Sequence, residues 1–386
     1  MMILSKDCLK KITSIILFSA FFISYSPSFA QTFELDSVSE EAHILPPAEQ
    51  EHALTAQNAG HADKEKFNAG EMILEHIGDA HEWHILTLSD HHVTVPLPVI
   101  LLNDGKVDVF MSGDFHHGEQ DVTTKNGNTY RLNHKGKIES VDGASFYDFS
   151  ITKNVLTLFV SAIILLFLFI GIANSYIKNK NKAPKGMQAV VEPFVIFIRD
   201  EVAKPAIGAK YNRYMPFLLT IFFFIWINNM LGLIPIIPFG ANLTGNIAVT
   251  MTLAMFTFII SLVVSNKNYW AHILAPDIPK SLYILLVPIE ILGVFLKPFV
   301  LTLRLFANMT AGHIIPLAFI SLIFIFAEMS PMAGYGVSVI SVGLSVFMKV
   351  LELLVCFLQA YVFTLLSAMY IGMATEEHSH DAHEHH

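Results

Sequence analysis

The sequence predicts a mostly helical protein that crosses a membrane several times and carries a small exported cap at its N-terminus. Of the 386 residues, 53% are hydrophobic and only 15% are charged, whereas soluble domains usually carry about 25% charged residues. Several apolar stretches reach the length of about 20 residues that a helix needs to span a bilayer. Acidic residues collect before the first long stretch. This composition excludes an ordinary soluble enzyme.

The first thirty residues have the pattern of a secretory signal peptide. Three lysines precede an apolar run over residues 12–23, and Ser28 and Ala30 stand at the spacing that a signal peptidase recognises. We expect residues 1–30 to be removed by cleavage after Ala30. An uncleaved N-terminal anchor is the alternative, and in either case the next segment would be exported.

Residues 31–150 are expected to form an exported, acidic, histidine-rich domain. Residues 31 to about 63 are polar without periodicity and are interpreted as a flexible leader. Residues 67–77 then suit a short amphipathic helix, and residues 83–88 and 93–102 alternate or are rich in β-branched side chains. Asn103-Asp104-Gly105 predicts a tight turn into a strand at 107–111. An α+β or β cap is the expected fold of this domain.

The charge and the histidines of this domain limit its partners. It holds seven Lys/Arg and 21 Asp/Glu, a net charge of −14, which argues against binding nucleic acid or docking on anionic lipid. It also holds eleven of the 18 histidines, but no fixed ligand frame such as HExxH. Solvated surface histidines are therefore favoured over a zinc or copper site. Two distant cysteines, Cys8 and Cys356, suggest no disulfide framework.

Residues 151–375 are expected to form the membrane domain. Residues 155–177 contain no charged side chain and suffice for one span. Four lysines follow this stretch closely, so the positive-inside rule places its C-terminal end in the cytoplasm. Residues 187–206 mix apolar and charged side chains, which suits a helix lying on the cytoplasmic surface. Residues 214–266 are uncharged and interrupted by prolines and glycines, which predicts two spans.

The next apolar stretch is too long for an upright span. Residues 280–327 would measure about 72 Å as one helix at 1.5 Å per residue, against a bilayer core of about 30 Å. This segment must therefore be strongly tilted, broken at Pro288, Pro298 or Pro316, or folded on itself.

Residues 338–374 are also long and, with the preceding stretch, predict an oversized helical hairpin that turns near Ser330. We therefore expect five transmembrane elements and one surface helix, with the last two spans long and tilted. Five crossings from an exported start place the histidine-rich tail, residues 376–386, in the cytoplasm. The chain is expected to be a multi-pass protein of the inner membrane.

A stripe of charged side chains lies inside the fourth span. Glu290, Lys297 and Arg304 follow at intervals of seven residues, which returns a helix to within about 20° of its starting direction. Asn308, one turn past Arg304, joins the same face. An uncompensated Lys or Arg at mid-bilayer costs from about 2.5 to above 10 kcal/mol, so the stripe needs an aqueous cavity or a protein partner. A polar clamp that only holds the bundle is the alternative.

His313 and the last span carry a second polar set. His313 follows Arg304 by nine residues and so points to the opposite side of an unbroken helix. Glu352 and Gln359 share one face of the last helix, with Lys349 one turn before Glu352. His313 and Glu352 are the two groups able to pass a proton near neutral pH. The residues alone leave open a proton relay and a merely structural role for His313.

Three short motifs resemble the subunit a family of the rotary F-type ATP synthases. They read KP at 297–298 with LRLFANM at 303–309 and AG at 311–312, NNMLGLIP at 228–235, and LQAYVF at 358–363. The resemblance spans roughly residues 150–377, and the arginine motif is its most specific part. Residues 31–150 exceed the usual N-terminus of the family.

The resemblance implies two long, tilted helices packed against a ring of c subunits, with subunit b and other ATP synthase subunits as further partners. Arg304 would face the carboxylate of the ring, and Asn308 and Gln359 would be its polar neighbours. The chain would be a non-catalytic subunit without cofactor or metal. In agreement, the sequence has no GxxxxGK[ST] phosphate loop, so no bound nucleotide is expected.

The resemblance also implies two offset half-channels for protons. Glu290 and Lys297 would line the cytoplasmic one, whereas His313 and Glu352 would serve the outer one. Many bacterial members carry the acid at the His313 position and the histidine at the Glu352 position, so the pair is exchanged here. Gly232 stands where some members have an acidic residue.

Two functions of other classes remain as alternatives. A proton-coupled secondary transporter would also place ionisable groups near the midplane, but it would usually show internal repeats and paired broken helices, which we do not find. An exported metal-binding module on a passive anchor would place the function in residues 31–150 and make Arg304 dispensable. The sequence does not determine whether H⁺ or Na⁺ is the coupling ion.

Overall fold

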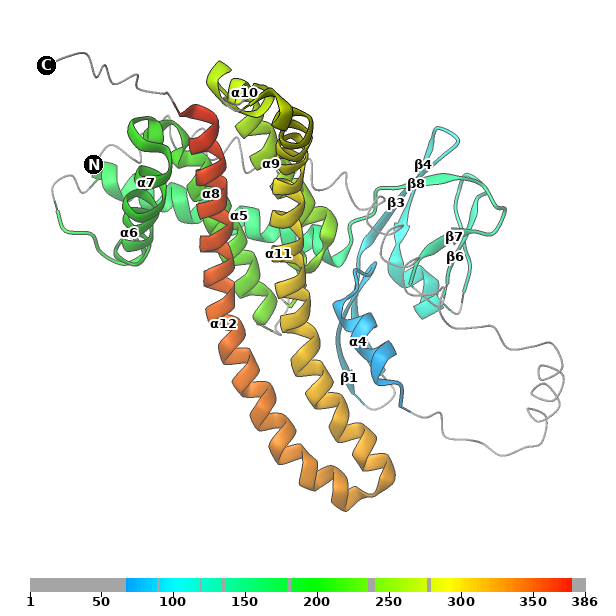
Figure 1. Cartoon of the computed structure of the whole chain (residues 1–386). Coiled ribbons are helices and arrows are strands. Elements are labelled where there is room, and N and C mark those ends of the chain that lie inside the picture. Colours follow the sequence, from blue (N-terminus) through cyan, green and yellow to red (C-terminus); the bar gives the residue numbers. More distant parts are fainter. Residues whose placement is uncertain are drawn as a thin grey trace, which may run out of the picture.

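The computed structural model describes residues 67–88, 91–118, 120–133, 136–178, 182–234, 240–275 and 279–376. The predicted signal peptide, the leader and nearly all of the C-terminal tail lie outside these residues. The described chain consists of a small cap rich in strands and a larger helical part, with the cap attached at one side of the helices (Figure 1).

The cap begins with one helix and continues as three small antiparallel sheets. The sheets have the strand orders β1-β2, β4-β3-β8 and β5-β6-β7. The predicted amphipathic helix and the predicted hairpin are both confirmed. The elements are α4 (Ala69–Ile77), β1 (Glu82–Leu88), β2 (His91–Pro96), β3 (Pro98–Asn103), β4 (Lys106–Met111), η1 (Ser112–Gly118), β5 (Val122–Thr123), β6 (Thr129–Leu132), β7 (Ile138–Ser140) and β8 (Phe146–Asp148).

The β3–β4 hairpin follows from its two turn residues. Asp104 has φ of 47° and Gly105 has φ of 76°, which is the left-handed conformation that both central residues of a two-residue hairpin turn require. Asn103 therefore pairs with Lys106 across the turn. The alternating side chains of β3 place Val99 and Leu101 in the cap core, where they meet Phe115.

The helical part is built from long helices with short capped connections. Asn246 caps α9 by accepting a hydrogen bond from the Ala248 amide at 2.9 Å. Its elements are α5 (Lys153–Lys178), α6 (Met187–Phe197), the π-helical turn η2 (Ile198–Ala203), α7 (Lys204–Ile207), η3 (Gly208–Lys210), α8 (Tyr211–Leu233), η4 (Leu243–Gly245), α9 (Ile247–Val263), α10 (Lys267–Leu274), α11 (Lys280–Met329) and α12 (Pro331–Thr375).

Within the described residues, four helical segments are long and apolar enough to cross a membrane. They are Lys153–Lys178, Met187–Leu233, Tyr283–Met329 and Pro331–Thr375. A fifth candidate is the pair α9 and α10, which is bent by 101°. The described chain thus has the helices of a multi-pass membrane protein. The expected five crossings equal the upper count, and the expected surface position of residues 187–206 stays a prediction.

Helices α11 and α12 form the expected hairpin, and α11 is unbroken. It runs over 50 residues through Pro288, Pro298 and Pro316, which corresponds to about 75 Å at 1.5 Å per residue. Of the three ways to accommodate this stretch, a break at a proline is therefore wrong for the described chain. Packed neighbouring helices commonly allow a membrane helix to continue through proline.

The last helix begins earlier than residue 338, the start that its apolar pattern predicted. Its first residue is Pro331, a residue favoured at the first helical position. Ser330 caps this end by accepting a hydrogen bond from the Ala333 amide at 3.1 Å. The turn of the hairpin therefore lies at Ser330, as expected.

The core of the helical part lies around α8, which is buried on nearly every side. Phe222 and Phe223 of α8 are almost fully inaccessible and both pack on Trp226, and Phe222 also packs on Phe357 of α12. α5 runs crosswise to the α11–α12 hairpin, from the cap to the side where α6 and α7 lie (Figure 1). A crosswise arrangement allows α5 to stand upright in a bilayer while the hairpin is strongly tilted.

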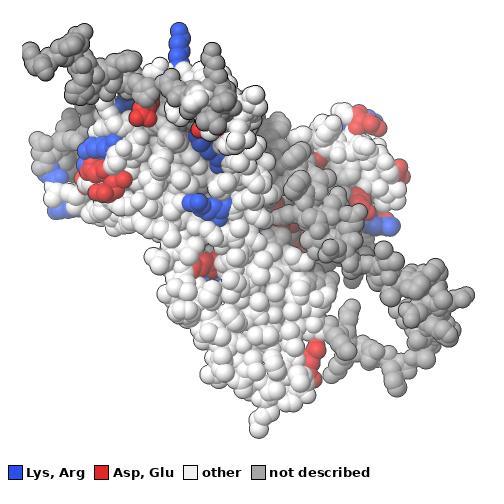
Figure 2. Space-filling view, viewed as in Figure 1, with Lys and Arg blue, Asp and Glu red and all other residues white. Residues whose placement is uncertain are grey.

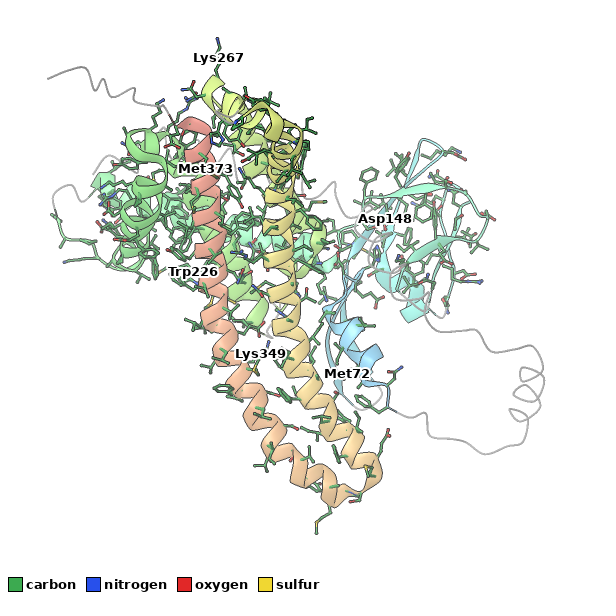
Figure 3. All side chains as sticks on the ribbon, viewed as in Figure 1. Met72, Asp148, Trp226, Lys267, Lys349 and Met373 are labelled. Carbon is green, nitrogen blue, oxygen red and sulfur yellow. The ribbon has the colours of Figure 1, made fainter. Side chains whose placement is uncertain are left out.

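The cap also contacts the hairpin directly. The ring of Phe67 packs on Phe324 of α11 with centroids 5.1 Å apart. The Phe67 amide donates a hydrogen bond of 2.7 Å to Glu328 near the end of the same helix. Met72, on α4, lies beside the lower half of α11, whereas Met373 marks the opposite end of the hairpin (Figure 3). The cap is therefore joined both to the start of α5 and to the hairpin.

We predict that Gly372→Ala destabilises the helical part. A Cβ at this position of α12 would overlap the Ala206 carbonyl oxygen of α7, and overpacking typically costs about 1–3 kcal/mol. The measurement is the thermal unfolding temperature of the purified chain in detergent. Gly343→Ala on the same helix is the control, because no described atom lies within 4 Å of its added Cβ. Equal unfolding temperatures for the two variants would contradict the α7–α12 packing.

Candidate functional site

Arg304 and Asn308 lie on the exposed side of α11. The exposed neighbours on this helix are apolar, and they include Leu296, Val300 and Leu303. α12 adds further exposed apolar side chains, including Val346, Phe347, Val350 and Leu354. Figure 2 shows the corresponding broad surface of the hairpin with few charged atoms. A guanidinium on such a surface lacks the solvation it would have in water, so its position favours an anionic partner outside the described chain.

Glu290 and Lys297 share the predicted stripe with Arg304 but have different surroundings. Lys297 is half-buried, and its Nζ lies 5.7 Å from the ring centre of Tyr269 on α10 and 5.4 Å from that of Tyr370 on α12. Such contacts stabilise an ammonium group away from bulk water. Glu290 lies seven residues before Lys297 on α11 and is partly buried. The structure therefore provides Lys297 with aromatic partners and leaves Arg304 facing outward.

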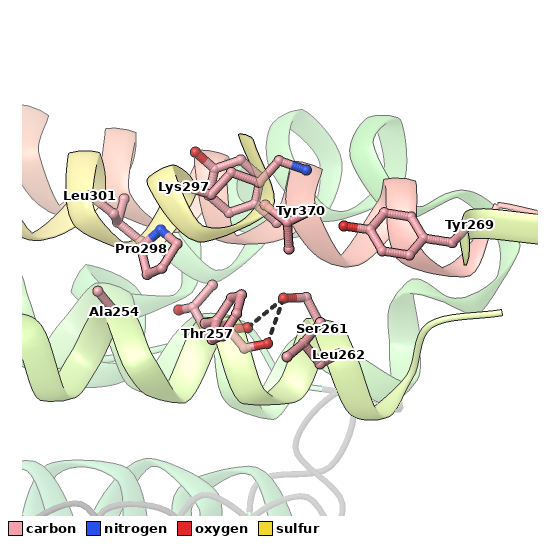
Figure 4. Close-up of a pocket in the computed structure, with 11 residues that line it drawn as sticks. Ala254, Thr257, Ser261, Leu262, Tyr269, Lys297, Pro298, Leu301 and Tyr370 are labelled. Carbon is pink, nitrogen blue, oxygen red and sulfur yellow. Dashed lines mark hydrogen bonds between the residues drawn. The ribbon is translucent and has the colours of Figure 1, made fainter. Parts of the chain in front are cut away.

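A cavity opens beside Lys297 between four helices (Figure 4). Its empty volume, including the open mouth, is about 320 Å³. Hydroxyl groups line one wall: Thr257 Oγ1 lies 3.1 Å from Ser367 Oγ, and Ser261 donates to the Thr257 carbonyl at 2.9 Å. The cavity is lined by Ala254, Thr257, Phe258, Ser261, Leu262, Tyr269, Val294, Lys297, Pro298, Leu301 and Tyr370. The space next to Lys297 is therefore partly polar.

His313 and Glu352 meet on the buried side of the hairpin. Their Nδ1 and Oε1 atoms are 3.1 Å apart, and both side chains are nearly inaccessible. His313 Nδ1 also lies within hydrogen-bond distance of the Met309 carbonyl oxygen, at 3.0 Å. Glu352 Oε1 has no hydrogen-bond partner among the described residues. Lys349 donates to Glu352 Oε2 at 2.9 Å and lies in the space between the two helices (Figure 3). The carboxyl group is thus held between an imidazole and an ammonium group.

Two glycines make room for this pair. A Cβ at Gly312 would come within 2.8 Å of Glu352 Oε1, so a larger residue would displace the carboxylate. A Cβ at Gly232 would lie 3.1 Å from the Ala241 carbonyl oxygen and 3.6 Å from His313 Nε2. Gly232 also presents its own carbonyl to His313 Nε2 at 3.4 Å. Gly232 therefore offers a backbone carbonyl, and no side chain, to the buried pair.

Gln359 is buried on α12, two turns beyond Glu352. Close to this level of the helix, Asn229 of α8 donates to the Cys356 carbonyl at 3.5 Å and accepts from Thr244 at 2.5 Å. Sequence reasoning missed Thr244, Tyr269 and Tyr370. Their only signal was an uncharged polar group or a tyrosine inside an apolar stretch, which is too common to single out a site.

The histidines of the cap form no recognisable metal site within the described residues. No group of three His, Cys, Asp or Glu side chains there has the arrangement of metal ligands. The side chains of His84, His91, His92 and His117 lie outside that description. His81 Nε2 lies 3.1 Å from Asp148 Oδ2. Burial lowers the pKa of His81, but the hydrogen bond and charge of Asp148 outweigh it, so the His81 pKa is raised.

Taken together, the apolar helices, the outward-facing arginine and the buried acid–histidine pair define a multi-pass membrane protein with ionisable groups inside its membrane domain. Residues 155–372 match the ATP synthase A chain family. Because this match covers more than half of the chain, the protein belongs to that family. Residues 72–156 match a second family, described as a domain of unknown function.

Named relatives agree with this assignment. ATP synthase subunit a of Chloroherpeton thalassium is 47% identical over 247 residues, which cover 62% of this chain and 71% of the relative. Subunit a of Myxococcus xanthus is 42% identical over 62% of this chain and 77% of its own. ATP synthase subunit a 2 of Chlorobium luteolum is 38% identical over 348 residues, which cover 89% of this chain and 84% of the relative. The similarity to this last protein therefore includes most of the cap.

We predict that exchanging the acid and the histidine restores a pair that either single change destroys. His313→Glu places two carboxyl groups together, and Glu352→His places two imidazoles beside Lys349. Each variant should lower the unfolding temperature in detergent. The double variant should recover most of the loss, because residues in contact couple by about 0.5–3 kcal/mol. His313→Glu combined with Glu290→Gln is the control, and those two losses should add. Additive losses in the exchanged pair would show that the contact contributes nothing.

Proposed function

We propose that this protein is the proton-translocating subunit of the membrane sector of a rotary F-type ATP synthase. In this proposal, two offset half-channels open onto a ring of c subunits, and subunit b and other ATP synthase subunits bind elsewhere on the chain. The observation that carries the proposal is the position of Arg304, which is exposed on an apolar face of α11. It lies between two polar clusters, one at Lys297 and its cavity and the other at the His313–Glu352 pair.

The two clusters are separated along α11. From Lys297 to His313 there are sixteen residues, or about 24 Å at 1.5 Å per residue. Arg304 lies between them but on the opposite side of the helix from His313. Between Lys297 and His313, Arg304 is the one titratable side chain that α11 carries. A proton that moves from one cluster to the other therefore requires a carrier outside this chain, which the ring carboxylate supplies.

In the proposed pathway, Glu290 and Lys297 line the cytoplasmic half-channel at the cavity of Figure 4. His313 and Glu352 serve the outer half-channel. The direct contact between their side chains supports this role, because a proton passes most readily between groups about 3 Å apart. Lys349 donates a hydrogen bond to Glu352 Oε2 at 2.9 Å, so Oε1 is the oxygen that faces His313.

Arg304 separates the half-channels electrostatically. Its guanidinium stabilises the ionised carboxylate of the ring through charge-assisted hydrogen bonds, and its charge repels a proton that would pass directly. Asn308 and Gln359 are its polar neighbours. Each proton that crosses 100 mV supplies about 2.3 kcal/mol, which the ring converts to rotation. The chain makes and breaks no covalent bond, so it is not itself an enzyme.

The proposed topology places the cap outside and the C-terminus in the cytoplasm of an inner-membrane protein with five crossings. Lys178 at the end of α5 supports this orientation through the positive-inside rule. The paired charges of Arg199, Asp200 and Lys204, with contacts of 2.6 Å, suit a cytoplasmic surface position for α6 to α7. The acidic cap is accordingly on the outer face.

We predict that Arg304→Ala abolishes ATP-driven proton pumping and proton-driven synthesis while leaving a passive proton leak. Arg304→Lys should also fail to couple, because a single ammonium group neither forms the paired hydrogen bonds nor keeps its charge reliably when desolvated. The measurement is ATP-driven acidification and passive proton flux in vesicles, both normalised to assembled complex. Near-normal coupling in either variant would remove Arg304 from the mechanism.

The control for this experiment is Lys267→Ala, which changes a cationic residue at the start of α10, outside the proposed pathway. A purely structural clamp at Arg304 predicts a different pattern. In that case the lysine variant would largely suffice, and the alanine variant would mainly lower the amount of assembled complex.

A further inference from the structure

A second cavity lies where the cap meets the helical part. Its empty volume, including the open mouth, is about 290 Å³, and it has room for a water molecule. The cap contributes one residue, Asp79, and α5, η4 and α9 contribute the rest. The lining residues are Asp79, Asn154, Val155, Leu158, Leu243, Asn246, Ala248 and Val249.

Asp79 is held at this junction by the start of α5. Its Oδ1 accepts hydrogen bonds from the Ala80 amide at 3.1 Å and from the Asn154 amide at 3.2 Å. The titratable groups that face it are Lys153 on α5 and His81 in the cap, which is paired with Asp148. Burial raises the pKa of Asp79, although a hydrogen bond from Thr152 and the charge of Lys153 oppose it.

The polar side chains in the cavity wall indicate that the cavity is a site for water and not an apolar packing contact. Asn154 is only 6% exposed, and its Oδ1 has no hydrogen-bond partner among the described residues. Buried polar atoms are nearly always satisfied, so such an atom beside a cavity of this size indicates a site for water. Across the cavity, Asn246 adds a second amide, while η4 and α9 bring no titratable group to the lining.

The η4 turn lies between this cavity and the level of the buried acid–histidine pair. Leu243, the first residue of the η4 turn, and Asn246, the residue after it, both line the cavity. Within that turn, Thr244 donates to Asn229 at 2.5 Å, and the Gly245 carbonyl accepts from Thr310 of α11 at 3.4 Å. Thr310 lies one helical turn before His313. The η4 turn is thus in contact with the cavity on one side and with the level of His313 on the other.

We propose that Asp79 of the cap is the proton-collecting residue at the outer mouth of the pathway. This inference rests on the proposed function. Asp79 takes a proton from outside water and releases it to water in the cavity, from which it moves along the η4 turn to His313 and Glu352. No covalent bond changes apart from the O–H bonds of the proton transfer. The family-typical helices provide the pathway, and the additional cap supplies its external carboxylate.

The test uses the complete ATP synthase in vesicles, with synthesis driven by an imposed membrane potential at equal pH on both sides. Asp79→Asn keeps an oxygen that can accept the hydrogen bonds of Asp79 but cannot carry its proton. At pH 8 the rate of ATP synthesis by the Asp79→Asn complex should be about tenfold lower than that of the unchanged complex. This is the lower end of what a focused charge adds to an association rate. At pH 6, where protons are abundant, the rate should stay within about twofold of the unchanged protein.

Two further variants separate proton collection from a structural role. Asp142→Asn changes an exposed acid of the cap outside the cavity lining and should leave both rates unchanged. Asp79→Glu should restore the pH profile. An Asp79→Asn loss that is equal at both pH values and follows the amount of assembled complex would reduce Asp79 to a cap for α5. Equal rates of synthesis for Asp79→Asn and the unchanged protein at pH 8 would also overturn the inference. Failure of the unchanged complex to couple proton flow to synthesis would instead overturn the proposed function.

Discussion

The cost of placing charge where water is scarce governs the arrangement of this protein. The α11–α12 hairpin is apolar over most of its surface, yet it carries Arg304, Lys297, His313 and Glu352. Each of these groups would be expensive if left without solvent or a partner. Three different arrangements compensate these charges in the structure. Lys297 lies against aromatic rings, Glu352 lies between His313 and Lys349, and Arg304 stays on a surface that an acidic partner would cover.

Close packing of the hairpin makes the second of these solutions feasible. Glycines stand where the backbone or a carboxylate of the neighbouring helix comes near, as at Gly312 beside Glu352 and at Gly334 beside Ala327. Small residues at such contacts allow membrane helices to approach closely. His313 and Glu352 therefore come into direct contact although they lie on different helices. Because α11 continues without interruption through its prolines, this contact and Arg304 stay at fixed positions along one rigid element.

The cap is more than an attachment to an anchor. It touches α11 through Phe67 and reaches the start of α5 through Asp79. The similarity to the Chlorobium luteolum relative extends through most of this region. In the proposed pathway, Asp79 of the cap supplies the carboxylate that Gly232 and Asn246, near the α8–α9 connection, do not.

The sequence by itself determined the elements and the faces of the helices. Asn103-Asp104-Gly105 predicted its hairpin, and the nine-residue spacing on α11 predicted that Arg304 and His313 lie on opposite sides of the helix. These features depend on local geometry, which a short window of sequence contains. Only the tertiary structure decided that α11 is unbroken, that two tyrosines lie next to Lys297, and that Asp79, one of 21 acids in residues 31–150, lines a cavity. Such contacts join residues far apart in the chain, and the offset between packed helices that creates them depends on the whole set of side chains at the interface.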